Sequence, residues 1–368
     1  MAAISYKAQK GRASLLTNLV LIVICILWLV PILGILITSF RPSTDIFQSG
    51  WWTVLPHKEN VQSGEIVLPA DVDVSGPITI DGVTHTFEEW RKGITMPDGR
   101  YLEWFGNRRT RKLTVSAEQW VGFASGFNLK NYEDVLTGKT ITYIDGNGQT
   151  ITRKGNDLSR AFLNSLAVAI PATIIPILIA AFAAFGFAWL NFPGRNIIFS
   201  LVVALLVVPL QIALIPILQD YVKLGLNGTF LGIWLAHTGF GLPLATYLLF
   251  NYISTLPREL LESAYIDGAS NFTIFVRMIL PLSVPALASF AIFQFLWVWN
   301  DYLVALVFLG GGDNRVVTYA VASLVGEKGQ DWHLMTAAAF VSMILPLVVF
   351  LGLQKYFVRG MLAGSVKG

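Results

Sequence analysis

Charge is scarce in this sequence. Only 13% of the residues are Asp, Glu, Lys or Arg, whereas 54% are hydrophobic and the mean hydropathy is +0.60. An ordinary soluble domain has about 25% charged residues, so this composition is typical of a membrane protein. The net charge of +3 is small and dispersed, which excludes the concentrated basic surface of a nucleic-acid-binding protein.

Residue patterns typical of catalytic and metal sites are also missing from the sequence. The single cysteine, Cys25, lies in an apolar run and cannot form an internal disulfide. A Gly-Lys-Thr tripeptide at 138–140 lacks the first glycine of a Walker A motif, because Glu133 occupies that position. No metal-ligand spacing relates the four histidines, which are His57, His85, His237 and His333. We therefore expect a non-catalytic chain without a metal or cofactor of its own.

Long apolar runs dominate what is present. Six runs are long enough to cross a bilayer, which takes roughly 20 residues, and they span 15–40, 161–190, 197–219, 229–253, 282–309 and 333–357. The first run is longer than the apolar part of a signal peptide and no small-x-small cleavage site follows it, so we interpret it as a retained anchor. The sequence predicts an all-α polytopic membrane protein with six transmembrane helices.

Basic residues predict the orientation of these helices. The short loops on one side hold nine Lys and Arg residues, which are Lys7, Lys10, Arg12, Arg195, Arg258, Arg277, Lys355, Arg359 and Lys367. The opposite short loops hold three, which are Lys223, Arg315 and Lys328. Because cytoplasmic loops carry the excess of basic residues, both termini and the loop 254–281 are expected in the cytoplasm.

The segment 41–160 differs from the rest in composition, since it holds fourteen basic and fifteen acidic residues. Strand-like pieces flank Asp81-Gly82 and the Asp-Gly-Asn-Gly run at 145–148, which favour hairpin turns. Five aromatic residues are expected to fill a small core, namely Trp90, Tyr101, Trp104, Phe105 and Trp120. We predict a β-rich extracytoplasmic insert between the first and second helices, with 1–40 before it and a five-helix core at 161–368 after it.

The polar stretch 257–282 between two apolar runs is the most specific feature of the chain. Pro257 suits the first turn of a helix, Asp267-Gly268 can end it, and Ser270 can cap a second helix that runs to Leu280. Four residues of the first helix fall at helical spacing on one apolar face: Leu260, Leu261, Ala264 and Tyr265. The sequence thus predicts a helix–turn–helix.

The pattern Glu-x-Ala-x-x-Asp-Gly-Ala from Glu262, followed by Ile-Leu-Pro-Leu at 279–282, resembles the cytoplasmic coupling loop of permease subunits in binding-protein-dependent ABC importers. Ser263 departs from the alanine usual in that family, but a small residue remains. The resemblance implies an interface with ATPase subunits formed by this loop and by the C-terminal tail 358–368, at Glu262, Ser263, Ala264, Asp267, Gly268, Ala269, Gly364 and Lys367.

Other segments resemble the carbohydrate-uptake, maltose-type branch of these permeases. They are Phe-Leu-Asn-Ser-Leu at 162–166, the run 209–216, Trp-Asn-Asp at 299–301, the segment 127–132 and the residues 363–368. The piece around 53–125 looks inserted, as in the α-glucoside subgroup. The resemblance implies a permease of an ATP-driven importer for di- or oligosaccharides such as maltose or trehalose, in the bacterial inner membrane.

The resemblance also implies the partners. They are a second homologous permease, two ATPase subunits that bind ATP and Mg, an extracytoplasmic sugar-binding protein and membrane lipid, with no nucleic acid. Polar side chains within membrane spans often mark a transport pathway, and aromatic faces suit sugars. The candidates for a sugar path are therefore Gln211, His237, Asn251, Gln294, Trp297, Asn300 and Asp301.

Alternatives stay open at this point. Each candidate path residue could instead serve only helix–helix hydrogen bonding. The whole chain could be a polytopic membrane sensor or enzyme with an external domain. It could also be a secondary transporter, although that class favours acidic residues in mid-span and an internal duplication.

Overall fold

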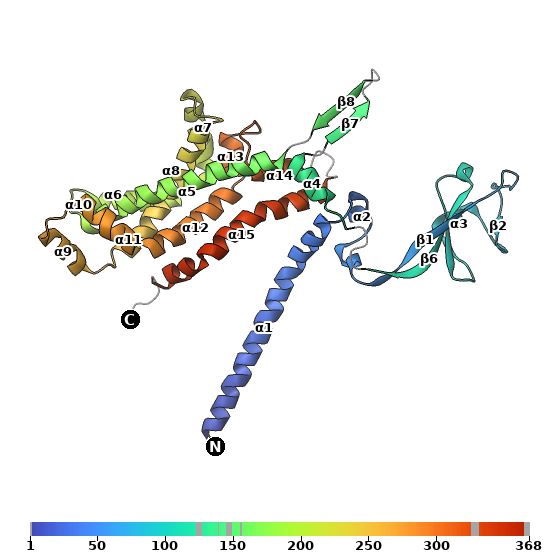
Figure 1. Ribbon diagram of the computed structural model, residues 1–368, viewed down its shortest axis with the longest axis horizontal. Helices are drawn as coiled ribbons and strands as arrows, with labels where there is room; N and C mark the ends of the chain where they lie inside the picture. Colours follow the sequence, from blue (N-terminus) through green and yellow to red (C-terminus); the bar gives the residue numbers. More distant parts are fainter. Residues whose placement is uncertain are drawn as a thin grey trace. The chain divides into compact units, whose positions relative to one another are not determined.

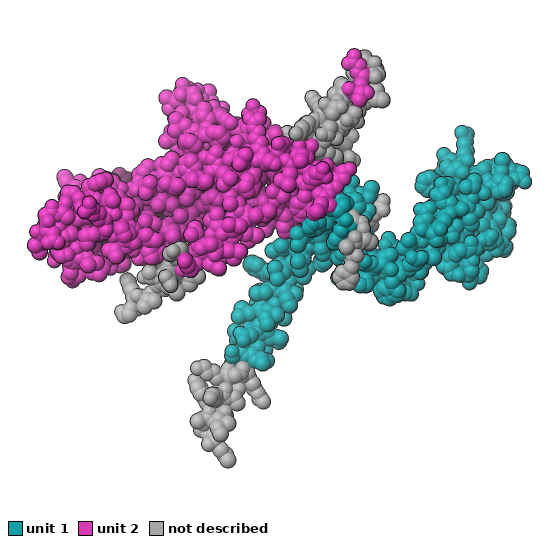
Figure 2. All heavy atoms as spheres, in the orientation of Figure 1, with its two compact units in different colours: residues 1–128 teal, residues 129–368 magenta. Residues whose placement is uncertain are grey.

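The computed structural model describes residues 2–122, 127–138, 140–144, 149–154, 157–324 and 331–363. The chain divides into two compact units, residues 1–128 and 129–368, which are coloured separately in Figure 2. The predicted hairpin turn at 145–148 and the tail residues Gly364 and Lys367 lie outside the described residues.

The first unit begins with the long helix α1 (Ala2–Ser39), whose stretch Ser14–Ser39 is long and apolar enough to cross a membrane. Two short helices follow it, α2 (Ser43–Gln48) and the 3₁₀ helix η1 (Trp51–Val54) (Figure 1). The expected first membrane helix is therefore present.

An antiparallel sheet forms the rest of the first unit. Its strand order is β1-β6-β5-β4, with β1 (His57–Val67), β4 (Ile94–Thr95), β5 (Arg100–Trp104) and β6 (Lys112–Val121). A hairpin and two short helices complete it: β2 (Ile78–Ile80), β3 (Val83–His85), α3 (Phe87–Lys92) and η2 (Arg108–Thr110). The hairpin turn is the predicted one, with φ of +47° at Asp81 and +82° at Gly82.

Only part of the predicted aromatic core of this unit is correct. Trp90 and Trp104 are buried, and the indole nitrogen of Trp90 donates a hydrogen bond to the carbonyl of Ile78. Tyr101 is half-buried. Phe105 and Trp120 are 60% and 71% exposed, so their assignment to the core was wrong. Phe105 follows the last residue of β5, and Trp120 lies on the part of β6 that pairs with β1 alone, as the strand registers show.

The second unit is mainly helical. It starts with α4 (Lys130–Thr137) and the antiparallel strands β7 (Thr140–Ile144) and β8 (Thr150–Lys154). The helices that follow are α5 (Leu158–Trp189), α6 (Arg195–Ala204), η3 (Leu205–Val207), α7 (Leu210–Lys223), α8 (Phe230–Ile253), α9 (Arg258–Ile266), α10 (Asn271–Ile274), η4 (Phe275–Ile279), α11 (Leu280–Leu282), α12 (Val284–Asn300), α13 (Leu303–Phe308), α14 (Val317–Ser323) and α15 (Trp332–Ala363).

Within the described ranges, four helices are long and apolar enough to cross a membrane, and two bent pairs could raise that number to six. The first bent pair, 195–207 with 210–223, covers the expected span 197–219, whereas the second, 271–282 with 284–300, joins the end of the loop 254–281 to the first part of the expected span 282–309. The first bends by 104° between η3 and α7, where Pro209 interrupts the helix. The second bends by 73° before Val284 and ends at Asn300, because the Asp301 carboxylate accepts hydrogen bonds from two backbone N–H groups of a new helix, α13.

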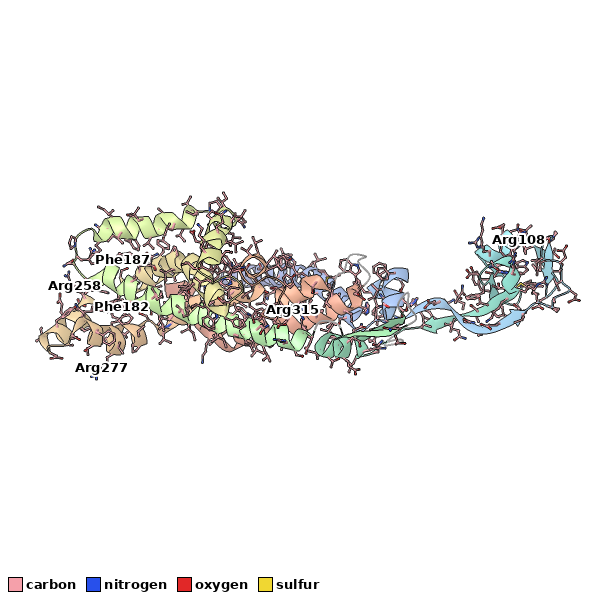
Figure 3. The ribbon with its side chains drawn as sticks, turned by 90° about the horizontal axis from the view of Figure 1, so that it is seen from above. Arg108, Phe182, Phe187, Arg258, Arg277 and Arg315 are labelled. Atoms are coloured by element: carbon pink, nitrogen blue, oxygen red, sulfur yellow. The ribbon has the colours of Figure 1, made fainter. Side chains whose placement is uncertain are left out.

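Helix α5 makes side-chain hydrogen bonds near both of its ends, and these bonds identify the two ends of the second unit. Near its start, the Asn164 amide donates hydrogen bonds to the carbonyls of Asp313 and Arg315. At its last residue, the Trp189 indole donates to the carbonyl of Ile253, just before α9. Since a helix of 32 residues is about 48 Å long, these two groups lie at opposite ends. Figure 3 likewise shows Arg258 and Arg277 at one end of the unit and Arg315 well away from them.

Candidate functional site

The predicted helix–turn–helix at 254–281 is here called the coupling loop. Several of its residues have backbone preferences that suit the position they occupy. Pro257 precedes α9 with φ −60° and ψ 129°. Gly268 ends that helix with φ +79°, a conformation that glycine adopts without a steric penalty. The N–H of Gly268 bonds to the carbonyl of Tyr265, and the N–H of Ala269 bonds to that of Ala264. These two bonds form a Schellman motif, which satisfies the last carbonyls of α9.

The second half of the loop begins as the sequence predicts. The Ser270 hydroxyl accepts a hydrogen bond of 3.2 Å from the backbone N–H of Thr273 and so caps α10. The helix then widens into the five-residue π-helix η4 directly before Leu280 and Pro281. A proline lacks the N–H for the normal helical bond and clashes with the carbonyl four residues earlier, so a local π-helix accommodates it.

One face of the coupling loop is part of the hydrophobic core of the bundle. Leu261, Ala264, Ile274, Phe275 and Ile279 are buried in one cluster with the C-terminal halves of α5 and α8. The Phe275 ring lies 5.2 Å from that of Phe182 and 5.7 Å from that of Phe185, measured between ring centroids. Figure 3 places Phe182 at the same end of the unit as Arg258 and Arg277. The loop therefore packs as an extension of the bundle.

Two of the four residues at helical spacing on α9 face the bundle. Leu261 and Ala264 are buried, whereas Leu260 and Tyr265 are 38% and 44% exposed. The Tyr265 hydroxyl instead donates to the Asn271 side chain and links α9 to α10. The short helix α9 has apolar residues on two adjacent faces, Leu261 with Ala264 and Leu260 with Tyr265. The face of Leu261 and Ala264 packs against α5 and α8.

The other face of the loop is open. Ile266 and Phe272 are 86% and 67% exposed, which is unusual for large apolar side chains outside the lipid-facing helices. Glu262 is exposed, and its carboxylate lies 3.3 Å from the Arg258 guanidinium. Of the described residues assigned to an ATPase interface, Glu262, Ser263, Asp267 and Gly268 are exposed, Ala269 is half-buried and Ala264 is buried against the bundle. A partner on this face would thus act on a segment continuous with the membrane helices.

The second feature is a cavity of about 500 Å³ between α7, α8, α12 and η3. The bend before α7 contributes one wall, and Gln294 and Trp297 on α12 contribute another. Aromatic and apolar groups dominate the lining, with Tyr221 and Phe240 among them. Such a surface, with few polar groups, is typical of a pocket for a small organic ligand.

Gln294 is held in a fixed position. Its side-chain nitrogen donates a hydrogen bond of 3.2 Å to the carbonyl of Ala172, and only 1% of the residue is exposed. Gly241 on α8 leaves the space that this side chain occupies, since a Cβ atom there would lie 2.7 Å from the Gln294 nitrogen. A side chain at 241 would therefore displace the Gln294 amide from its place beside the cavity.

The remaining candidate path residues divide into two groups. His237 is buried beside the largely covered side chain of Asp301, with 3.6 Å between His237 Nε2 and Asp301 Oδ2. The His237 ring contacts the Trp297 ring edge-on, with 5.5 Å between the ring centroids. Gln211, Asn251 and Asn300 are exposed and line none of the described pockets.

Four residues that line the cavity were not among the candidates from the sequence: Tyr221, Phe240, Gly239 and Gly241. The available signal was the grouping of glycines within an apolar span.

Comparisons with known proteins agree with this geometry. Residues 176–363 match the family described as "Binding-protein-dependent transport system inner membrane component". The osmoprotective compounds uptake permease protein GgtD of Synechocystis sp. is 46% identical over 351 residues, which are 95% of this chain and 91% of the relative. The alpha-glucoside transport system permease protein AglG of Rhizobium meliloti is 45% identical, with 98% of this chain and 100% of the relative covered.

A solved structure supports the fold. A bacterial ABC transporter involved in the import of the acidic polysaccharide alginate has a chain with a TM-score of 0.51 and 19% identity, which covers 64% of this chain and 81% of that one. The chain belongs to the family of inner-membrane permease components of binding-protein-dependent transport systems. It is a multi-pass permease subunit of an ABC importer, a family that is not catalytic and whose ATPase lies in separate subunits. The family resemblance is confirmed, and the alternatives of a sensor, an enzyme or a secondary transporter are set aside.

Proposed function

We propose that this permease imports α-glucosidic di- or oligosaccharides such as maltose or trehalose. The observation that carries the proposal is the likeness to the alpha-glucoside permease AglG, which extends over 98% of this chain and so takes in the insert. The melibiose/raffinose/stachyose import permease protein MelC of Bacillus subtilis, by contrast, aligns over 57% of this chain at 32% identity. The insert is thus a feature that this chain shares with relatives of the AglG kind.

The working assembly consists of this chain, a second homologous permease, two ATPase subunits and an extracytoplasmic sugar-binding protein. ATP and Mg bind to the ATPase subunits, since the sequence of this chain lacks a complete Walker A motif. We place six spans in the membrane with both termini and the coupling loop in the cytoplasm. The separation of the coupling loop from Arg315 along α5 supports this topology.

The coupling loop transmits the movement of the ATPase subunits. Glu262, Ser263, Asp267 and Gly268 on its open face seat in a cleft of the ATPase, Ala264 and Ala269 support that face, and Gly364 and Lys367 in the tail add contacts. The buried face of the loop belongs to the same cluster as α5 and α8, so a push on the loop moves these helices as a rigid body.

The sugar passes along the cavity beside α8 and α12. Trp297 provides an aromatic face and Gln294 an amide, both at the cavity wall. His237 and Asp301 lie next to Trp297 and keep the outer end of α12 in place through their buried contact. The insert 41–160 and the core 161–368 act as separate domains in this proposal.

The 46% identity to GgtD favours a second candidate, uptake of osmoprotective compounds. Reconstituted transporter with all its subunits separates the two candidates. ATP-dependent uptake of labelled maltose is expected, with little competition from betaine, an osmoprotective compound that is not a sugar. Competition by betaine and no uptake of maltose would favour the second candidate.

The role of the coupling loop has its own test. Glu262→Lys combined with Gly268→Pro should abolish both uptake and co-purification of the ATPase subunits, while the permease remains in the membrane. Glu259→Lys is the matched control, because Glu259 is an exposed glutamate of the same helix outside the assigned interface. Normal uptake by the double variant would contradict the proposed coupling.

A further inference from the structure

The segment between α1 and the sheet of the first unit is held to α1 by specific contacts. Residues 43–56, here called the elbow, comprise α2, η1 and the two residues that follow. The Arg41 side chain is 6% exposed and donates hydrogen bonds to the carbonyls of Asp45 and Ser49, at 3.0 and 3.2 Å, and to the Ser49 hydroxyl at 2.5 Å. These bonds satisfy carbonyls at the end of α2 and hold the elbow to the top of α1.

The elbow folds back along α1. Gly34 is buried, whereas residues 14–33 of α1 are exposed, because the Trp51 indole packs against it; the indole nitrogen lies 2.7 Å from the point where a Cβ at Gly34 would be. Gly34 precedes the end of the helix by five residues, which is about 7.5 Å. Trp51 therefore lies beside the membrane-spanning part of α1 and below its outer end.

The length of the span fixes the depth of this contact. The stretch Ser14–Ser39 has 26 residues and is about 39 Å long, whereas the hydrocarbon core of a bilayer is about 30 Å thick. A centred span puts Gly34 near the outer boundary of the hydrocarbon core. Figure 1 shows α2 at the end of α1 opposite the N-terminus. In the proposed topology this is the end at which the chain leaves the membrane on the outer side.

The surface of the elbow is apolar and almost uncharged. Phe47, Trp52 and Leu55 are 61%, 62% and 52% exposed. Asp45 is the one charged residue in the sequence 43–56, and no Lys or Arg occurs there. Tryptophan and other aromatic residues are enriched at the headgroup level of membranes, where their rings contact the acyl chains. The absence of basic residues argues against binding through anionic headgroups.

We propose that the elbow is an interfacial membrane anchor, in which Trp52, Phe47 and Leu55 insert into the outer leaflet at the boundary between headgroups and acyl chains. The partner is the lipid surface itself. Because Trp51 and Arg41 fix the elbow to α1, the anchor holds the base of the insert at the membrane. The sheet of the first unit then starts from a fixed point at His57.

Spin labelling of the complete transporter in lipid vesicles tests the anchor. Since Cys25 is the single cysteine of this chain, Cys25→Ser gives a permease without cysteine, which is labelled before it is assembled with the other subunits. Labels are attached at Trp52→Cys and Leu55→Cys in that background. Phe105→Cys is the control in water, as Phe105 is exposed at a distal turn of the sheet, and native Cys25 is the reference within the span.

We expect the labels at 52 and 55 to be much less accessible to a water-soluble nickel chelate than the label at 105. They should remain accessible to oxygen, which dissolves in the bilayer. The same depth is expected with and without anionic lipid. Nickel accessibility equal to that at 105 would mean that the elbow lies in water. Low accessibility to both reagents would mean that protein covers it. Either outcome would overturn the proposal, and neither depends on transport activity.

Discussion

Replacing Phe275 by alanine removes a side chain that joins the coupling loop to the bundle. Its ring is 7% exposed and packs against the rings of Phe182 and Phe185 on α5. None of these rings belongs to the group on the open face of the loop, such as Ile266 and Phe272. We therefore expect Phe275→Ala to leave the partner-binding face in place and to weaken the connection behind it.

The size of this effect follows from the two ring contacts. Each aromatic pair contributes about 0.5–1.5 kcal/mol beyond the burial of its area. Loss of both pairs weakens the packing of the loop by about 1–3 kcal/mol, and the cavity left by the ring adds to this. A change of that size shifts the ratio of packed to unpacked loop by roughly 5- to 150-fold.

The assay is the number of sugar molecules imported per ATP hydrolysed by the reconstituted transporter. For Phe275→Ala we expect ATPase subunits to co-purify normally and the import per ATP to fall several-fold. Ile266→Ala is the matched control, because its side chain is 86% exposed and its loss should instead reduce co-purification. An unchanged import per ATP in Phe275→Ala would refute the reasoning that the buried face transmits the movement.

Three further predictions follow from single residues. Gly241→Ala displaces the glutamine beside the cavity and should lower uptake, whereas Gly239→Ala, which also faces the cavity but has open space, should not. Gly268→Ala forces a left-handed conformation that costs about 1–2 kcal/mol and should speed hydrogen exchange in the coupling loop. Hydrogen bonds from the backbone and side chain of Thr86 hold the pKa of Glu89 below its ordinary value. Ionised Glu89 therefore stabilises α3 above the ordinary glutamate pKa of about 4.3, and this stabilisation is lost as the pH falls through the lowered pKa. Limited proteolysis of the insert should then increase with acid in the native chain, and Glu89→Gln should reduce that dependence on pH.

The coupling loop could be predicted in detail because its sequence holds residues with few backbone options. Gly268 supplies a positive φ, Ser270 supplies a cap and Pro257 cannot sit in mid-helix, so the ends of both helices follow from chemistry. Which of Leu260 and Leu261 faces inward could not be predicted, since that depends on the neighbouring helices α5 and α8.

The cavity and the insert core were less predictable for similar reasons. The bend at Pro209 turns one apolar run into two helices, and both halves have the composition of a straight span. Strand periodicity brings aromatic side chains to a face, but a face is buried only where another layer covers it, and Trp120 lies where β6 pairs with β1 alone. Gln294 was selected because polar groups in mid-span are rare, and Trp297 because it lies close in sequence to Asn300, whereas the glycines that line the cavity have no side-chain chemistry of their own.

Sided chemical labelling at the turn of the coupling loop tests the central claim most directly. Asp267→Cys in the Cys25→Ser background places one thiol at an exposed position between α9 and α10. A membrane-impermeant maleimide should label it in inside-out vesicles stripped of ATPase subunits, and the bound subunits should protect it. Labelling from the outer side of sealed cells would contradict the account, because the loop would then face away from the source of ATP.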